Sequence, residues 1–125
     1  MKLNKKLKAI CDLVETNSEI IDIGTDHGYV PIYLNKIKNC QCLATDISEK
    51  SIEKAKNNAK KAKANITFLC TDGLENIALT NQIIIIAGMG TSTILKILDI
   101  NINNDLIIST NNDTDTLKKA LKNKN

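Results

Sequence analysis

The pattern of apolar positions predicts five short strands separated by helical segments. Continuous apolar runs occur at residues 20–23, 42–44, 66–69, 83–87 and 106–108. Apart from Asp22 and Thr67, these runs are apolar at successive positions instead of every second one, which is typical of parallel strands that are covered on both faces. Residues 82–87 are the most apolar run and are predicted to lie at the centre of the sheet. The chain is therefore predicted to be an α/β protein with a mostly parallel, doubly wound sheet.

Helical spacing of apolar residues predicts the elements that cover this sheet. Residues 3–14 carry an apolar stripe that ends before Asn17 and Ser18. A second helix is predicted over residues 48–62, with a capping box at residues 46–49. Its outer face is rich in lysine, and we interpret that face as solvated, with an RNA-binding stripe as the less favoured alternative. Residues 117–122 are predicted to form a lysine-rich helix with no strand after it, so the sheet is expected to end at about its fifth strand.

Length and composition limit the classes of protein to consider. A chain of 125 residues is one domain, and its net charge of +3 comes from seventeen lysines and no arginine. This lysine bias is weak evidence for a nucleic-acid partner, because arginine forks that grip phosphate are missing. With four cysteines, no Cys-x-x-Cys pair and a single histidine, we expect reduced packing cysteines and no metal site. No apolar run approaches the length of a membrane span, so a cytoplasmic protein is expected.

The first apolar strand runs directly into a glycine turn and a helix. Asp22 and Gly24 end the strand, and Thr25, Asp26, His27 and Gly28 lead into the helix. A glycine here lets the backbone approach a ligand, and the amides of the helix N-terminus point at the same space. The turn lacks the dinucleotide fingerprint, and Asp26 would repel a pyrophosphate. It suits a ligand with a cationic amino acid end, such as S-adenosylmethionine.

The other predicted strand ends also carry residues suited to ligand binding. Ligands of open parallel sheets bind outside the carboxyl ends of the strands. Asp46 follows Gly24 by twenty-two residues, a spacing suited to a ribose hydroxyl, although it could also cap the next helix. Asp72 and Gly73 could contact an adenine or could simply form a turn. After the fourth strand, Gly88 and Gly90 are expected to relieve crowding where a substrate approaches.

The aromatic residues of the turn add candidate base contacts. Tyr29 could stack on a substrate base, whereas Tyr33, one helical turn later, is expected in the core. For His27 a structural and a functional role remain equally open. Pro31 lies early in the helix, where the N–H group that proline lacks is not needed for a helical hydrogen bond, so proline destabilises the helix little.

Three sequence strings together resemble a known family. They are the run from Asp22 to Ile32, DIGTDHGYVPI; the run from Asp72 to Leu74, DGL; and the run from Ala87 to Gly90, AGMG. They are similar to those of the bacterial tRNA (adenine(22)-N1)-methyltransferase family. The resemblance implies a Rossmann-like class I methyltransferase, here a single catalytic domain over residues 1–125. It also implies S-adenosylmethionine as cofactor and an adenine of the tRNA D-arm as substrate, with no membrane or metal; it leaves the oligomeric state open.

The same resemblance implies the roles of individual residues. The amino acid end of the cofactor is expected to bind the turn after the first strand. Its ribose is expected to bind Asp46 and Ile47, and its adenine is expected to bind Asp72, Gly73 and Leu74. The methyl-transfer site is expected beside Ala87, Gly88 and Met89. The residues expected at the turn are Asp22, Gly24, Thr25, Asp26, His27 and Gly28.

The chain departs from the family pattern at three places. Thr91 stands where the family usually has a further glycine, and Ser109, Thr110 and Asn111 replace a Gln-Pro-Asn string. Family members also continue well past this length, with a helical C-terminal region associated with tRNA docking.

The methyl transfer expected from the resemblance requires mainly that the adenine and the methyl group are positioned correctly. Adenine N1 has its own lone pair, so a carboxylate that favours the cationic product and an aromatic ring that holds the base are the expected catalytic groups. Asp26 and Tyr29 are the candidates for these roles. Alternative hypotheses are a remnant or partner-dependent domain that binds S-adenosylmethionine without turnover, and a small-molecule methyltransferase. A nicotinamide-binding domain is the least favoured alternative.

Overall fold

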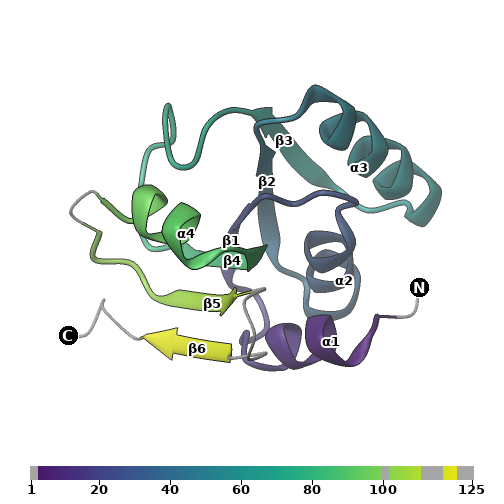
Figure 1. Ribbon diagram of the computed structural model, residues 1–125. Coiled ribbons are helices and arrows are strands. Elements are labelled where there is room, and N and C mark those ends of the chain that lie inside the picture. Colours follow the sequence, from purple (N-terminus) through teal and green to yellow (C-terminus); the bar gives the residue numbers. More distant parts are fainter. Residues whose placement is uncertain (1–2, 100–101, 111–116, 121–125) are drawn as a thin grey trace.

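The computed structural model describes residues 3–99, 102–110 and 117–120 and contains one six-stranded sheet (Figure 1). The strands lie in the order β3-β2-β1-β4-β5-β6. Their bounds are β1 Glu19–Ile23, β2 Gln41–Asp46, β3 Ile66–Cys70, β4 Ile83–Met89, β5 Leu106–Thr110 and β6 Leu117–Ala120. The helices are α1 Lys5–Asp12, α2 Tyr29–Lys38, α3 Glu49–Ala62 and α4 Thr91–Ile97.

The strands β1 to β5 are all parallel, as predicted from their apolar runs. The most apolar strand, β4, lies between β1 and β5 in the interior of the sheet, which confirms its predicted place. Strand order reverses between β1 and β4, because the chain first builds outward to β3 and then returns to the other side of β1. In open α/β sheets the ligand crevice lies at such a reversal.

The predicted helix over residues 117–122 is wrong. Residues Leu117–Ala120 form β6, which pairs with β5 in the antiparallel direction. The helix was predicted from composition alone. A four-residue segment beside an open strand edge gains more stability from hydrogen bonds to that edge than from a single helical turn, because nucleating a helix is costly.

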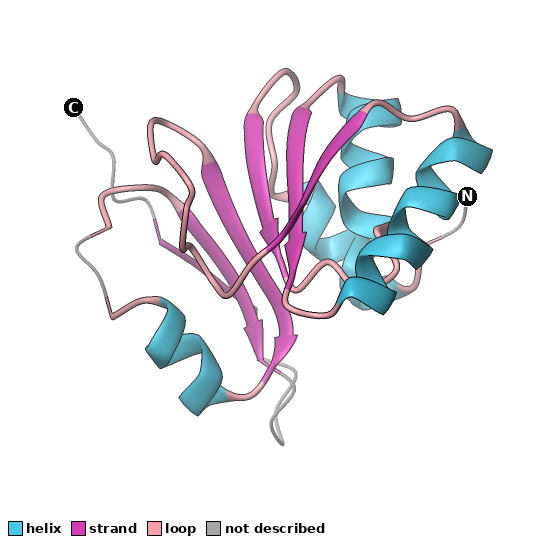
Figure 2. Cartoon of the chain, turned by 90° about the horizontal axis from the view of Figure 1, so that it is seen from above, coloured by secondary structure: helices cyan, strands magenta, loops and turns pink. Residues whose placement is uncertain are grey.

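The helices cover the two faces of the sheet unequally. In Figure 2, α1, α2 and α3 lie on one face and α4 lies on the other. A helix was expected between the third and fourth strands, but the segment from residue 71 to residue 82 forms turns instead. Gly73 and Asn76 both adopt a positive φ there, which interrupts any helix. Within the described residues, no helix combines the length and hydrophobicity that crossing a membrane requires.

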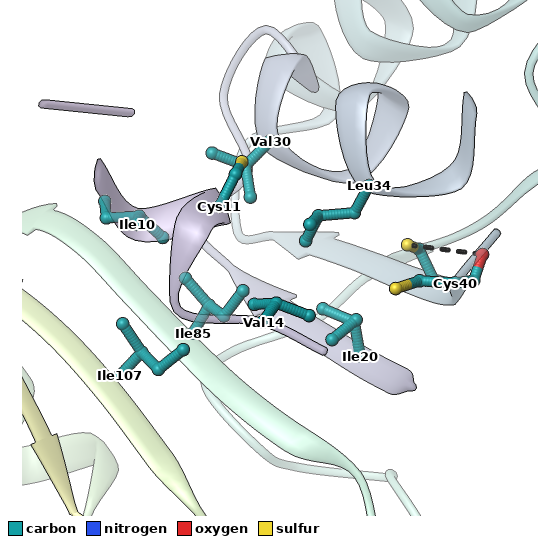
Figure 3. Close-up of a cluster of buried hydrophobic side chains, with 10 residues drawn as sticks. Ile10, Cys11, Val14, Ile20, Val30, Leu34, Cys40, Ile85 and Ile107 are labelled. Carbon is teal, nitrogen blue, oxygen red and sulfur yellow. Dashed lines mark hydrogen bonds between the residues drawn. The ribbon is translucent and has the colours of Figure 1, made fainter. Parts of the chain in front are cut away.

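The core on the α1–α3 face is built from branched aliphatic side chains and cysteines (Figure 3). Ile10, Cys11 and Val14 bring the apolar stripe of α1 onto the sheet, where Ile85 and Ile107 are fully buried. Tyr33 packs against this cluster, as predicted. A second cluster on the α4 face includes Ile94 of α4.

Three of the four cysteines are packing residues, in line with the expectation that most of them are, and Cys70 is exposed. All four are free thiols, and Cys11, Cys40 and Cys42 are buried. Burial raises the pKa of the Cys11 thiol to about 12, and the neighbouring Asp22 carboxylate adds to this effect. Burial also raises the pKa of the Cys42 thiol. Both thiols therefore stay protonated and behave as small apolar side chains.

Candidate active site

A large cavity opens at the carboxyl ends of the parallel strands. Its volume is about 1160 Å³, and it is lined by residues that follow β1, β2, β3 and β4. Because the carboxyl ends of parallel strands meet at one edge of the sheet, the four strand-end motifs of the sequence, far apart along the chain, converge on one space.

The glycine turn after β1 forms the floor of this cavity. Gly24 has φ +71°, a left-handed conformation that a side chain would strain. The Thr25 amide donates to the Thr45 carbonyl at 2.8 Å, which ties the turn to the end of β2. A Cβ atom built on Gly24 would collide with the terminal methyl of Met89. The flexible thioether side chain of Met89, at the end of β4, therefore occupies part of the space beside Gly24. This contact could not be predicted from the sequence.

Asp22 is a buried carboxyl at the base of the cavity. Its exposed fraction is 3%, and alternation along β1 places it on the same side as Ile20, beneath α1. Burial is the main cause that raises the pKa of the Asp22 carboxyl from 3.8 to about 7; the nearby Thr25 hydroxyl opposes this rise, and the Asp46 carboxylate contributes to it. A cationic ligand placed here would favour the ionised carboxylate.

Two threonine hydroxyls that line the cavity have unused hydrogen-bonding capacity. The Oγ1 atoms of Thr25 and Thr45 are buried, and neither makes a hydrogen bond of good geometry within the described part of the chain. Buried hydroxyls normally have partners, so an unpaired pair that lines a cavity fits a site that a polar ligand completes. Thr25 was predicted as a site residue, whereas Thr45 was not.

Asp46 both shapes the turn and lines the cavity. One carboxylate oxygen accepts from the Asp26 amide at 3.0 Å, and the other accepts from the Ser48 amide at 3.0 Å. The N-cap of α3 is Ser48, whose hydroxyl accepts from the Ser51 amide at 3.2 Å. Asp46 is therefore not the helix cap itself; it joins the β1 turn to the start of α3.

Asp72, Gly73 and Leu74 form a tight turn after β3 at one end of the cavity. The Glu75 amide donates to the Asp72 carbonyl at 3.1 Å, and Gly73 has φ +56°. A Cβ on Gly73 would lie 3.4 Å from Cγ1 of Ile97, so α4 packs closely over this turn. The motif is a turn, as one of its two interpretations predicted, and its residues also line the cavity; contact with an adenine stays a prediction.

The rim of the cavity carries a stacked pair of rings. His27 and Tyr29 lie with their centroids 5.2 Å apart and their planes 13° from parallel. Nδ1 of His27 lies 3.0 Å from the Asp26 carboxylate, and Asp26 has a positive φ of 54°. The Tyr29 side chain is 41% exposed, so the pair presents a flat aromatic surface and a carboxylate to the opening.

The end of β4 provides a wall with a backbone irregularity. The register with β5 shifts between Ala87 and Met89, so Gly88 forms a bulge with φ +72°. A Cβ on Gly88 would meet nothing within 4 Å, so this position faces open space, and its expected role where a substrate approaches stays a prediction. The bulge gives a second reason for glycine here, because its backbone conformation suits glycine. Gly90, with an ordinary φ of −69°, is the N-cap of α4.

Nearly all of the predicted site residues line the cavity, including Ile47, which is 70% exposed at its edge. Gly28 is the exception. A Cβ there would lie 3.0 Å from Cβ of Ala55, so Gly28 permits the close packing of the turn against α3.

Sequence reasoning missed the residues that reach the cavity from outside the strand ends. They come from the start of α1 and from α4 with the residues after it, and include Asn4, Lys6, Leu7, Thr93, Lys96 and Asp99. No local motif marks the start of α1 as part of a site. Among the described residues, no group of histidine, cysteine, aspartate and glutamate side chains is arranged to hold a metal ion.

Comparison with known proteins confirms the resemblance seen in the sequence. A family model described as "Methyltransferase domain" matches residues 3–125. The tRNA (adenine(22)-N(1))-methyltransferase of Bacillus subtilis is 35% identical over 104 residues, which are 79% of this chain and 43% of that protein.

Solved structures of similar proteins share the fold. Mycoplasma capricolum TrmK, in complex with S-adenosyl-homocysteine, superposes with a TM-score of 0.81 at 32% identity, over 91% of this chain and 54% of that one. Streptococcus pneumoniae Sp1610, in complex with S-adenosyl-L-methionine, has a TM-score of 0.78 at 28% identity, over 90% and 57%. The chain thus spans about half the length of these relatives.

Proposed function

Since the chain belongs to the family of methyltransferase domains, we propose that it transfers the methyl group of S-adenosylmethionine to N1 of an adenine in tRNA, at position 22 of the D-arm. The observation that carries this proposal is the convergence of four strand-end motifs on one cavity of about 1160 Å³. The similar proteins named above support the cofactor and the substrate, since one is a tRNA (adenine(22)-N(1))-methyltransferase and two were solved with the cofactor or its product.

The residues of the cavity fit the proposed cofactor. The buried Asp22 carboxyl and the unpaired Thr25 and Thr45 hydroxyls offer acceptors to a cationic amino acid end. The open backbone of Gly24 lets that end lie against the turn. Asp46 offers a carboxylate to the ribose. The adenine is expected on the Asp72–Leu74 turn, and the remaining contacts are expected from Asp26, His27, Ile47, Ala87, Gly88 and Met89. Gly28, predicted as a cofactor contact, acts through the packing of the turn against α3.

Asp26 and Tyr29 are the proposed catalytic residues. The bound cofactor supplies an electrophilic methyl group; the adenine N1 lone pair forms the new C–N bond while the C–S bond breaks and its electron pair goes to sulfur. Tyr29 holds the base by stacking, from a ring already braced by His27. The exposed Asp26 carboxylate at the mouth favours the positive charge that the methylated base acquires. N1 lies on the Watson–Crick edge, so the base must be unpaired before it enters the cavity.

The test is methyl transfer from labelled S-adenosylmethionine to unmodified bulk tRNA. Reverse-transcription stops map the modified position, and calorimetry measures cofactor affinity in parallel. A stop at adenine 22 is expected. Tyr29→Phe should retain most of the activity and Tyr29→Ala should lose it, with cofactor affinity unchanged in both variants. Cofactor binding without any stop would favour a remnant or a partner-dependent domain, and methylation of small molecules alone would favour the other alternative.

A further inference from the structure

The turn that carries the proposed catalytic groups has a backbone conformation that needs support. Asp26 adopts a φ of 54° and Gly28 a φ of 79°, so two left-handed residues flank His27. A residue other than glycine stays in this region only where the surrounding structure holds it there. The orientation of the Asp26 carboxylate and of the stacked His27 and Tyr29 rings therefore depends on contacts made from outside the turn.

Helix α3 supplies a contact at the centre of this turn. Nδ2 of Asn58 donates to the His27 carbonyl oxygen at 2.9 Å, across 31 positions of the chain. Helix α2 begins after its N-cap Gly28, whose carbonyl accepts from the Ile32 amide at 3.1 Å. The His27 carbonyl thus precedes the helix and lies outside its ladder of hydrogen bonds, so the side chain of Asn58 provides the donor that the helix does not.

Asn58 is placed by a well-packed face of α3. The Asn58 side chain is half-buried, and Ala55 and Ala59 on the same face of the helix are buried. A Cβ on Gly28 would lie 3.0 Å from Cβ of Ala55, so the helix backbone lies directly behind the turn. The short side chain of Asn58 therefore reaches the His27 carbonyl from a fixed position.

Asn58 supports the turn from the side away from the cavity. Asp26, His27 and Tyr29 line the cavity, whereas Asn58 is not among the described lining residues. The Asp26 amide is also held, by the Asp46 carboxylate at 3.0 Å, but Asp46 is itself a proposed cofactor ligand. Replacing Asn58 therefore loosens the turn without removing a group that is proposed to touch the cofactor or the base.

We propose that Asn58 is a positioning residue: it fixes the His27 backbone and so keeps the stacked rings and the Asp26 carboxylate where the target adenine enters the cavity. This proposal rests on the proposed function, because it concerns the catalytic groups of the same site. A misplacement of about 1 Å caused from outside the reacting groups can reduce a rate by about 100-fold. The hydrogen bond from Asn58 is therefore expected to matter for turnover.

The single histidine of the chain allows this positioning to be measured directly. In NMR spectra of protein with isotope-labelled histidine, the Cε1–H resonance belongs to His27 and is shifted by the ring current of Tyr29, whose centroid is 5.2 Å away. Tyr29→Leu gives the position of this resonance without the stack. At one fixed pH, Asn58→Ala should move the resonance toward that position. Asn57→Ala, at an exposed asparagine of the same helix, changes helix propensity equally and should leave the resonance in place.

Steady-state kinetics with an unmodified tRNA transcript test the consequence for the reaction. Asn58→Ala should lower kcat by about 10- to 100-fold. The KM for tRNA should change little, because contacts to phosphates supply most of the affinity for RNA. Asn57→Ala should keep both constants, and Asn58→Gln, which retains the amide donor on a longer side chain, should lie between wild-type protein and Asn58→Ala. Calorimetry with S-adenosylhomocysteine should give the same number of sites per chain for every variant, so that a loss of folded protein is excluded as the cause.

The two measurements separate this proposal from the proposed function. An unchanged His27 resonance in Asn58→Ala would overturn the positioning role, whether or not wild-type protein methylates tRNA. A moved resonance with the kcat of wild-type protein would also overturn it, because Asn58 would then be a purely structural residue. A moved resonance together with wild-type protein that does not methylate tRNA would overturn the proposed function and would leave Asn58 as the residue that orients the two rings.

Discussion

Replacing Asp22 by asparagine should remove a large part of the pH dependence of folding stability. Burial raises the pKa of this carboxyl in the folded protein to about 7, against 3.8 in its ordinary environment. The folded state therefore holds the proton more tightly, and the associated stability is present below about pH 4 and is lost as the pH rises through 7. One pKa unit corresponds to about 1.4 kcal/mol, so the loss is about 4 kcal/mol. This is a large share of the about 5–15 kcal/mol that stabilises a typical domain.

The groups around Asp22 make this titration specific. Cys11 and Cys42 face it from α1 and β2, but burial keeps both thiols protonated over the same pH range. The Asp46 carboxylate, at the end of β2, raises the pKa of Asp22, and the Thr25 hydroxyl opposes it. Asparagine matches the size of the protonated carboxyl and cannot ionise, so Asp22→Asn isolates the cost of the buried charge.

Urea unfolding at pH 4.5 to 8.5, followed by far-ultraviolet circular dichroism, measures the effect. The chain has no tryptophan, so a backbone signal suits it better than fluorescence. Relative to wild-type protein, Asp22→Asn should gain about 3 kcal/mol between the lowest and the highest pH, because about 1 of the about 4 kcal/mol is already lost at pH 4.5. Asp99→Asn, an exposed carboxylate of the same cavity, is the control. A constant difference between wild-type protein and Asp22→Asn across the whole range would refute the reasoning. The same variant should bind S-adenosylmethionine less tightly at pH 8, because it lacks the charge that favours a cationic ligand.

Two further substitutions test the cofactor site. Gly24→Val should abolish S-adenosylmethionine binding in calorimetry and should cost about 1–3 kcal/mol of stability, because a side chain at φ +71° is strained; unchanged affinity would contradict the role of the turn. Asp46→Ala should weaken cofactor binding by about 1–3 kcal/mol, the usual range for a lost charged hydrogen-bond partner. Ser48→Ala removes only the cap of α3, so equal affinities of these last two variants would reduce Asp46 to a structural residue.

The sequence predicted β1 to β5 because each contains a short run of mostly apolar residues, which is typical of strands in a parallel sheet. Ile84, Ile85 and Ile86 are fully buried in β4, in the interior of the sheet, as their unbroken hydrophobicity indicated. The left-handed turn at Gly24 was also predictable, because a strand that ends in glycine before a helix needs a conformation that other residues avoid. These features depend on neighbouring residues.

The segments that were predicted incorrectly are those whose structure depends on distant partners. Leu117–Ala120 is a strand because the edge of β5 is available to it, and no local pattern states that. The loop from residue 71 to residue 82 has helix-like apolar spacing in part, but Gly73 and Asn76 bend it. Gly88 lies in a bulge that exists only because β4 pairs with β5, so its conformation cannot be predicted from neighbouring residues.

The sequence by itself determined the parallel sheet, the glycine turn and the set of acidic strand ends, because each follows from local hydrophobicity or backbone sterics. Only the tertiary structure decided which of these groups are buried, paired or close together. Asp22 became a buried acid because α1 covers it, and Met89 came to lie on Gly24 because β1 and β4 are neighbours. Lys6 reached the cavity because α1 packs across the sheet to the end of β5. Such contacts join residues about 60 to 100 positions apart, and burial and charge proximity depend on that packing and not on any local pattern.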